Sequence, residues 1–445
     1  MINLYKIISF KNLIFSLLFS ISAILVSGQN AGQHENSGDT LKTSQPADHA
    51  IEHKADEHEE FDPAATAFHH ISDQNIYSIG PFNLPLPCIL YSKGKSDFLS
   101  SWDIFSSTKF GFEGMGHGDG EKAYKQFVLH EGQVMKVQDP SFPTDEVEVS
   151  GFIHREENDA NSKPIDVYYV NYHGHEYKLD KKSTGDGGLF GGGLTSFYDF
   201  SFGKNAISML LVCFLLGWLF IYIARAYKNN PGRAPKGIQN LIEPIVLFLR
   251  DEVAKPFIGA KWEKFFPFLM SLFFFILGLN LFGQIPFLGG SNVTGNISVT
   301  MVLALLTFII TTMNGTKHYW EHIVWMPGVP AWIKIILTPV EILGIFIKPL
   351  TLTLRLFASI TAGHMALVVF VSLIFIFGKS GQSVGGSLGA SIGSGLLSIF
   401  MMAIELLIAF VQAYVFTLLT ASYLGAATEE HHKEHPVKGD QHSSH

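Results

Sequence analysis

The feature that most constrains this chain is a series of apolar runs in its second half, each long enough to cross a bilayer. Ala206 to Ala224 contains no charged residue, and Ile333 to Phe377 is apolar apart from a few ionisable groups. A helix needs about 20 apolar residues to cross a hydrocarbon core of ~30 Å. Charged residues make up only 16% of the chain, against roughly 25% in soluble domains. The bilayer is therefore the expected solvent for residues 201–425.

Three further runs complete the predicted membrane domain: Phe265 to Leu288, Ile297 to Met313 and Leu396 to Leu424. Gly237 to Gly259 mixes charged and apolar residues, which is typical of an amphipathic helix lying in the interface. Gly378 to Gly395 is rich in Gly and Ser and is predicted to be a loop. The expected fold is an all-α integral membrane protein with about five to six membrane helices, of which the last two are long and tilted.

The N-terminal part has a different composition. Lys6 and Lys11 precede a short apolar run, which predicts a signal peptide over residues 1–28, with an uncleaved signal anchor as the alternative. Residues 29–65 are acidic and His-rich and read as a disordered linker. Residues 66–200 form a polar module in which Gln126 to Val137 and Asp166 to Leu179 alternate as half-buried strands do. We therefore expect a small β-containing module on the exported side.

The orientation follows from the basic residues. The loop from Arg225 to Lys264 contains eight Lys and Arg residues, whereas residues 289–296 contain none. The positive-inside rule places the basic loop in the cytoplasm. Residues 29–200 are then outside, and the His-rich tail at 426–445 is cytoplasmic, as expected for a multi-pass protein of the plasma (inner) membrane.

Two bulk properties exclude other classes of protein. A net charge of −8 argues against nucleic acid as a partner, because a phosphate backbone requires a basic patch. Cys88 lies in a polar region and Cys213 inside an apolar run, so no disulfide framework is expected.

The last two apolar stretches carry ionisable residues that the bilayer disfavours, namely Glu341, Lys348, Arg355, His364 and Glu405. One such group at the centre of a membrane helix costs about 2.5–3.5 kcal/mol on insertion scales. Because a helix turns about 100° per residue, Glu341, Lys348 and Arg355 fall on one stripe, and His364 lies about 180° from Arg355. Glu405 and Gln412 share a face in the final stretch. This pattern favours proton transfer, and the alternative is a structural role in which the groups only pair within the bundle.

The run from Lys348 to His364, KPLTLTLRLFASITAGH, resembles the signature helix of subunit a of F-type ATP synthases. Glu405 to Leu419 resembles the partner helix of that family, and Asn280 to Pro286 resembles the end of an earlier helix. The resemblance covers roughly residues 200 to 425 and implies a stationary, proton-conducting subunit of a rotary ATP synthase. It also implies three partners: a ring of small hairpin subunits that carry buried carboxyls, peripheral-stalk subunits, and membrane lipid.

In such a subunit, Arg355 faces the ring and prevents a direct leak between two half-channels. His364, Glu405 and Gln412 would line the outer half-channel, and Glu341 would belong to the inner one. The resemblance implies a proton path formed by Arg355, His364, Glu405, Gln412, Glu341, Ser359, Asn280 and Lys348. Two departures stand out: His364 and Glu405 are exchanged relative to many bacterial members, and Ser359 replaces the usual asparagine. No catalytic residue, cofactor or metal is expected, and the chain is not an enzyme on its own.

Three other classes of protein are weaker alternatives. His318-Tyr319-Trp320-Glu321-His322 matches the H-x-x-E-H pattern of a zinc protease, but the same pattern recurs at residues 49–53 and 431–435, in polar tails. Secondary transporters show internal repeats, and we find none. A haem-binding subunit requires axial ligands at membrane depth, for which only His364 qualifies. No G-x-x-x-x-G-K-[ST] loop occurs, so the chain does not itself bind and cleave ATP.

Overall fold

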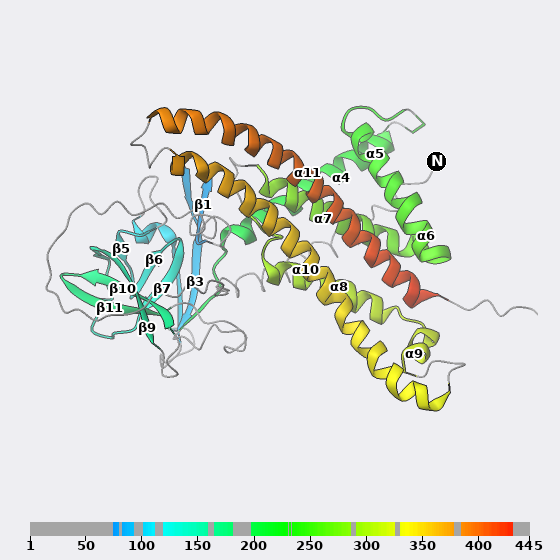
Figure 1. Cartoon of the computed structure of the whole chain (residues 1–445), viewed down its shortest axis with the longest axis horizontal. Coiled ribbons are helices and arrows are strands. Elements are labelled where there is room, and N and C mark those ends of the chain that lie inside the picture. Colours follow the sequence, from blue (N-terminus) through cyan, green and yellow to red (C-terminus); the bar gives the residue numbers. More distant parts are fainter. Residues whose placement is uncertain are drawn as a thin grey trace, which may run out of the picture.

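The structure is a computed structural model, and it describes two parts of the chain, a β module and a bundle of long helices (Figure 1). The described residues are 74–79, 82–92, 101–111, 119–158, 164–180, 197–229, 231–232, 234–285, 291–324, 330–377 and 384–429. The predicted signal peptide, the linker and most of the C-terminal tail lie outside these residues, so those assignments remain predictions.

Among the described residues, the β module has four antiparallel sheets. The largest has five strands in the order β6-β7-β11-β10-β9, and a three-stranded sheet has the order β12-β3-β4. The strands are β1 (Ile76–Ile79), β2 (Phe82–Pro85), β3 (Pro87–Ser92), β4 (Trp102–Ser106), β5 (Lys122–Ala123), β6 (Phe127–His130), β7 (Gln133–Val137), β8 (Val147–Glu148), β9 (Gly151–Asn158), β10 (Pro164–Tyr172), β11 (His175–Asp180) and β12 (Phe197–Asp199), with a 3-10 turn η1 (Ser107–Phe110) after β4.

Each of the two stretches predicted as alternating strands is a β-hairpin. The first contains β6 and β7, joined at Glu131 and Gly132, and the second contains β10 and β11, joined at His173 and Gly174. All four of these turn residues have positive φ, between 50° and 80°. Two-residue loops of this kind match the twist of paired strands. The prediction of strands is therefore confirmed. Each predicted stretch contains two strands with a turn between them.

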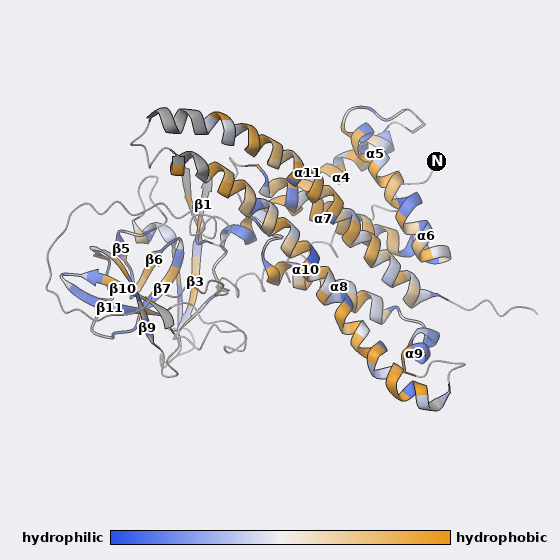
Figure 2. Ribbon diagram, viewed as in Figure 1, coloured by the Kyte–Doolittle hydropathy of each residue, from blue (hydrophilic) through white to orange (hydrophobic). Residues whose placement is uncertain are grey.

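The membrane domain contains the helices predicted from hydropathy, and its ribbon is predominantly apolar (Figure 2). Among the described residues, four helical segments are long and apolar enough to cross a bilayer, or five if the bent pair α8 and α9 counts as one. The helices are α4 (Lys204–Asn229), α5 (Ile238–Phe248), η2 (a π-helix, Leu249–Ala254), α6 (Lys255–Ile258), η3 (a 3-10 turn, Gly259–Lys261), α7 (Trp262–Gly283), α8 (Ile297–Met313), α9 (Lys317–Val324), α10 (Ala331–Phe377) and α11 (Val384–Thr428).

One boundary was predicted wrongly. The Gly/Ser-rich run from residue 378 to 395 was expected to be a loop, but α11 is helical from Val384 onward. Gly and Ser weaken helices in water. In a bilayer the backbone must satisfy its own hydrogen bonds, and small residues allow helices to approach closely, so such a run can remain helical.

The core of the bundle forms where α7 packs against α4 and α11. Phe273 and Ile276 of α7 are fully buried, and the ring of Phe273 lies 5.7 Å from that of Phe410 on α11. α10 and α11 run side by side along most of their length (Figure 1). The end of this pair at Phe377 and Val384 lies toward the β module, and α6 and α9 lie toward the opposite end. The two longest helices therefore bring together residues that are far apart in the sequence.

Candidate functional site

The site is centred on a contact between α10 and α11. Nδ1 of His364 lies 3.7 Å from Oε1 of Glu405, and the two side chains are 13% and 5% exposed. Gly363 faces the same side chain, since a Cβ at this glycine would be in van der Waals contact with Cγ of Glu405, at 3.6 Å. Two titratable groups predicted from different stretches are thus adjacent inside the membrane domain.

A small cavity, which we call the His–Glu cavity, opens beside this pair. Asn280 of α7 lies in its wall, buried, and its amide donates to the carbonyl oxygen of Ala409 at 3.2 Å. The hydroxyl of Thr294 donates to Oδ1 of Asn280 at 2.7 Å. The lining residues are Leu279, Asn280, Gly283, Gln284, Ser291, Asn292, Thr294, Ile360, His364 and Glu405. Asn280, which was predicted to be a polar lining group, therefore lies in the same cavity wall as His364 and Glu405.

Three polar residues of this cavity were missed by the reasoning from sequence: Ser291, Asn292 and Thr294. They belong to the segment before α8, which enters the bundle, and all three are buried. The hydroxyl of Ser291 and the side-chain nitrogen of Asn292 find no protein partner in the described part of the chain. The signal available in the sequence was the uncharged polar run that contains Ser291, Asn292 and Thr294, between two apolar runs.

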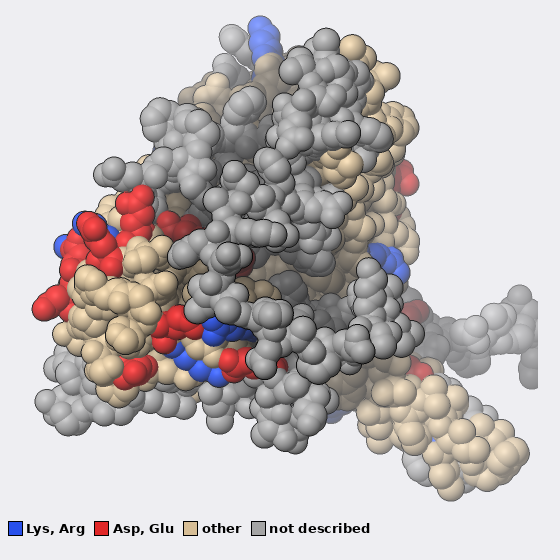
Figure 3. Space-filling view, turned by 60° about the vertical axis from the view of Figure 1, so that its left-hand side comes forward, with Lys and Arg blue, Asp and Glu red and all other residues tan. Residues whose placement is uncertain are grey.

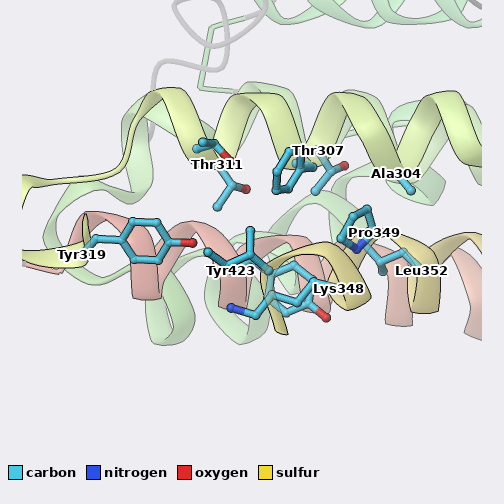
Figure 4. Close-up of a pocket in the computed structure, with 11 residues that line it drawn as sticks. Ala304, Thr307, Thr311, Tyr319, Lys348, Pro349, Leu352 and Tyr423 are labelled. Carbon is cyan, nitrogen blue, oxygen red and sulfur yellow. The ribbon is translucent and has the colours of Figure 1, made fainter. Parts of the chain in front are cut away.

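A second cavity, the Lys–Tyr cavity, lies nearer the N-terminal end of α10 (Figure 4). Nζ of Lys348 lies 5.4 Å from the centre of the Tyr423 ring, within cation–π range. Several hydroxyl groups of α8 and α9 complete its polar side. The lining residues are Ala304, Thr307, Phe308, Thr311, Thr312, Tyr319, Ile345, Lys348, Pro349, Leu352 and Tyr423.

Arg355 lies between the two cavities along α10. It follows Lys348 by seven residues and precedes His364 by nine, which corresponds to about 10 Å and 13 Å along a helix. Its side chain is exposed, and within the described part of the chain it forms no ion pair. Leu356, 1% exposed, lines neither cavity and lies in the core next to Arg355, whereas Leu352 lines the Lys–Tyr cavity. A buried apolar side chain and an exposed arginine thus occupy the same level of the helix.

The remaining predicted site residues line neither cavity. Ser359 uses its hydroxyl locally, donating to the backbone oxygen of Arg355 at 2.7 Å. Glu341 is half-buried in the first part of α10, and Gln412 is half-buried on α11, seven residues after Glu405. The structure therefore brings together His364, Glu405 and Asn280 at one cavity and places Lys348 at the other.

The H-x-x-E-H pattern at His318 falls on the short helix α9, where the rings of His318 and His322 are 6.4 Å apart. Among the residues that the structure describes, no group of three or more His, Cys, Asp or Glu side chains is placed to hold a metal. The other two copies of the pattern lie outside the described residues.

These features define a class: a multi-helix membrane protein with titratable groups held at membrane depth on two adjacent helices. The family model "ATP synthase A chain" matches residues 206–425. Together with the relatives described next, this match shows that the chain belongs to the ATP synthase A chain family. A second family model, a domain of unknown function, matches residues 66–167.

Several curated relatives are similar over the membrane domain. ATP synthase subunit a of Myxococcus xanthus is 36% identical over 55% of this chain and 80% of the relative. ATP synthase subunit a of Chlorobium phaeobacteroides is 36% identical over 55% of this chain and 70% of its own length. ATP synthase subunit a 2 of Chlorobaculum tepidum is 40% identical over 52% of this chain, which spans 64% of that relative.

Proposed function

We propose that the chain is the stationary proton-conducting subunit in the membrane sector of a rotary ATP synthase. In this role it catalyses no reaction itself. It conducts protons to and from the carboxyls of a rotating ring through two half-channels, and Arg355 blocks direct passage between them. Membership in the ATP synthase A chain family supports the proposal that the chain is part of an ATP synthase. The geometry of α10 supports the proposed mechanism.

One observation carries the mechanism: two cavities that each contain polar side chains lie beside α10, with Arg355 at an intermediate level. A continuous polar path across the membrane would dissipate the proton gradient. Two paths that end at different levels force a proton to leave one, bind the ring and re-enter at the other. Each charge that crosses 100 mV releases about 2.3 kcal/mol, so a leak at this level would waste the energy used for synthesis.

Arg355 suits the role of a barrier because arginine stays protonated in proteins. A carboxylate on a passing ring subunit is stabilised by this charge, yet the guanidinium cannot relay a proton. The surrounding surface is apolar and exposed, with Leu350 of α10 at 55% and Leu407 of α11 at 64% exposure. A large exposed apolar patch of this kind is typical of a surface that contacts lipid or another membrane subunit, and we assign it to the ring.

The half-channels divide the remaining polar residues. His364, Glu405, Asn280 and Gln412 form the half-channel that opens toward the β module, on the outer side of the membrane. Lys348 and Glu341 belong to the half-channel that opens toward α9, on the cytoplasmic side. Ser359 shapes the helix between them. We assign protons as the transported ion because an imidazole such as that of His364 is a natural proton relay.

The remaining partners and the orientation follow from the same arrangement. The basic segment around α5 and α6 would lie at the cytoplasmic face of the plasma (inner) membrane, the β module would be exported, and the C-terminus would be cytoplasmic. Peripheral-stalk subunits would hold the chain stationary against the turning ring.

The test is proton-driven ATP synthesis in membrane vesicles that carry Arg355→Ala, beside Ser372→Ala as a control on the same helix. We expect synthesis to be abolished and passive proton leak to rise in the Arg355 variant, with assembly of the complex unchanged. If that variant assembles and synthesises ATP at the rate of the control, Arg355 is structural and the proposed mechanism is wrong.

A further inference from the structure

The outer face of the three-stranded sheet β12-β3-β4 is apolar, whereas its inner face also buries Asp103, Asp199 and Ser92. Cys88, Leu90 and Phe197 point inward and are fully buried in the core of the β module. Because successive strand residues point to opposite faces, the intervening residues form the outer face. We call this set the aromatic face: Ile89, Tyr91, Trp102, Ile104, Tyr198 and Phe200.

The aromatic face is continuous and uncharged. The ring of Trp102 lies 5.1 Å from that of Tyr91 and 5.5 Å from that of Phe200, and the Tyr91 and Tyr198 rings are 6.4 Å apart. Ile104 is 68% exposed and Phe200 is 38% exposed. The other four members, Ile89, Tyr91, Trp102 and Tyr198, are half-buried. A contiguous, partly exposed apolar surface of this composition is typical of an interaction site.

Elsewhere the surface of the β module is that of a protein in water. Acidic and basic side chains gather over it (Figure 3). Glu146, for example, accepts from Lys109 at 3.3 Å and from Lys122 at 3.0 Å. The aromatic face, which has no charged member, is therefore distinct from the rest of the module.

The aromatic face lies next to the first membrane helix. Phe200 precedes the first residue of α4 by four positions, and the exposed side chains of α4 between Leu210 and Tyr222 are apolar or aromatic, with Phe214 70% exposed. Figure 1 shows β3 between the remainder of the β module and the helices. Because the inner face of this sheet packs on the module, its outer face is turned toward the membrane domain.

Hydrogen bonds fix the sheet to the start of α4. The amide of Asn75 donates to the carboxylate of Asp199 at 3.3 Å, and the backbone N–H of Lys204 donates to the carbonyl oxygen of Gln74 at 2.8 Å. The hydroxyls of Ser208 and Tyr77 are 3.5 Å apart. All of these groups lie at the junction between the module and the helix, so the height of the aromatic face above the bilayer is set by α4.

We propose that the aromatic face rests on the lipid headgroup layer at the membrane surface nearest the β module. Tyr and Trp side chains favour this layer because their rings are apolar and their polar atoms remain hydrated. Lipid is the occupant that the position favours, because the aromatic face continues the apolar surface that α4 exposes to the bilayer. The module is then a peripheral membrane-binding element that is independent of the proton path.

The test is nitroxide accessibility in the full-length chain reconstituted into vesicles of phosphatidylethanolamine and phosphatidylglycerol. Ile104→Cys is spin-labelled in a chain that carries Cys213→Ala. The remaining native cysteine, Cys88, is fully buried and should not take the label. Phe214→Cys on α4 serves as the reference for lipid, and Glu148→Cys, on the exposed strand β8, serves as the reference for water.

We expect the label at position 104 to collide with oxygen more, and with a water-soluble nickel chelate less, than the label at position 148, with values between the two references. An accessibility equal to that at position 148 would show a surface in water and overturn the proposal. A label shielded from both reagents would show a protein partner and overturn it equally. Proton transport is not measured, so the outcome is separate from that of the Arg355 experiment.

Discussion

His364 of α10 and Glu405 of α11 meet in the interior of the bundle, with Nδ1 and Oε1 separated by 3.7 Å. Both side chains are almost entirely buried. Burial of titratable groups in a bilayer is unfavourable unless they are paired or solvated. The pair lies in the wall of the His–Glu cavity, which also exposes the polar groups of Asn280 and Thr294. The proposed proton path therefore has two side chains of titratable type next to each other at this cavity.

The first prediction concerns the exchange of these two residues. His364→Ala or Glu405→Gln alone should reduce ATP-driven proton pumping by about a hundredfold or more, the range typical for loss of a proton-transferring side chain. The double variant His364→Glu with Glu405→His should recover much of the activity. The exchange keeps one imidazole and one carboxylate facing each other across the same helix contact. Acidification of inverted vesicles measures the rate.

The control for this series is Ser372→Ala, which lies on α10 beyond the cavity. The idea fails if both single variants pump at the control rate. It also fails if the exchanged pair pumps no better than either single variant while assembling normally.

The second prediction concerns the apolar barrier between the two cavities. Leu356 is 1% exposed and lies one residue from Arg355. Asparagine has a similar size but carries hydrogen-bonding groups, so Leu356→Asn should admit water and increase the passive proton leak of vesicles without ATP. Leu354→Asn is the matched control, because Leu354 is 46% exposed on the outer surface of the same helix. An equal leak in the two variants would show that Leu356 is not part of the barrier.

The helices were predictable because their chemistry is local. A bilayer requires long apolar runs, and hydropathy detects them directly. The start of α11 was not predictable from propensities measured in water, since Val384 begins a helix within a Gly/Ser-rich run. The hairpin turns Glu131-Gly132 and His173-Gly174 were also missed. Neither dipeptide matches the Asn-Gly or Asp-Gly signal for such turns.

The site was predictable only in part. His364, Glu405 and Arg355 stand out because ionisable residues are rare in apolar stretches, and the family resemblance indicated their roles. Helical periodicity on one segment could not show that His364 contacts Glu405 on another, or that Asn292 lies beside them. These relationships depend on the packing of α7, α10 and α11, which a pattern along one segment does not record.

The third prediction concerns a close crossing between α11 and α6. A Cβ at Gly425 would collide with the carbonyl oxygen of Phe257 and would lie 2.9 Å from its carbonyl carbon. The clash is with backbone, which cannot rotate away, so Gly425→Ala should destabilise the packed bundle by about 1–3 kcal/mol. Thermal unfolding of the purified chain in detergent measures the loss.

Gly395→Ala is the control for this crossing, since a Cβ at that position of α11 meets nothing within 4 Å. We expect the control to unfold at or slightly above the temperature of the parent chain, because alanine favours the helix. A melting temperature for Gly425→Ala equal to that of the control would show that α6 and α11 are not packed as closely as described.

The fourth prediction concerns the thiol of Cys88 in the β module. Burial, with a smaller contribution from the charge of Asp199, raises the pKa of Cys88 from an ordinary value of 9.0 to about 12. The thiolate is the reactive form, so Cys88 should resist iodoacetamide at pH 9 in the folded chain and react after unfolding. Ile104→Cys, in the same Cys213→Ala background, provides an exposed thiol that should react in both states.

The same shift has a defined effect on stability. Below about pH 8 the thiol is protonated in both states and its contribution is nearly constant. Between pH 9 and pH 12 the unfolded chain loses this proton while the folded chain retains it, so stability falls as pH rises. Cys88→Ala should remove this part of the pH dependence in urea unfolding, followed by the fluorescence of Trp102 in a chain whose other five tryptophans are replaced by phenylalanine. A Cys88 that is alkylated in the folded chain as fast as the exposed thiol at position 104 would contradict the buried placement.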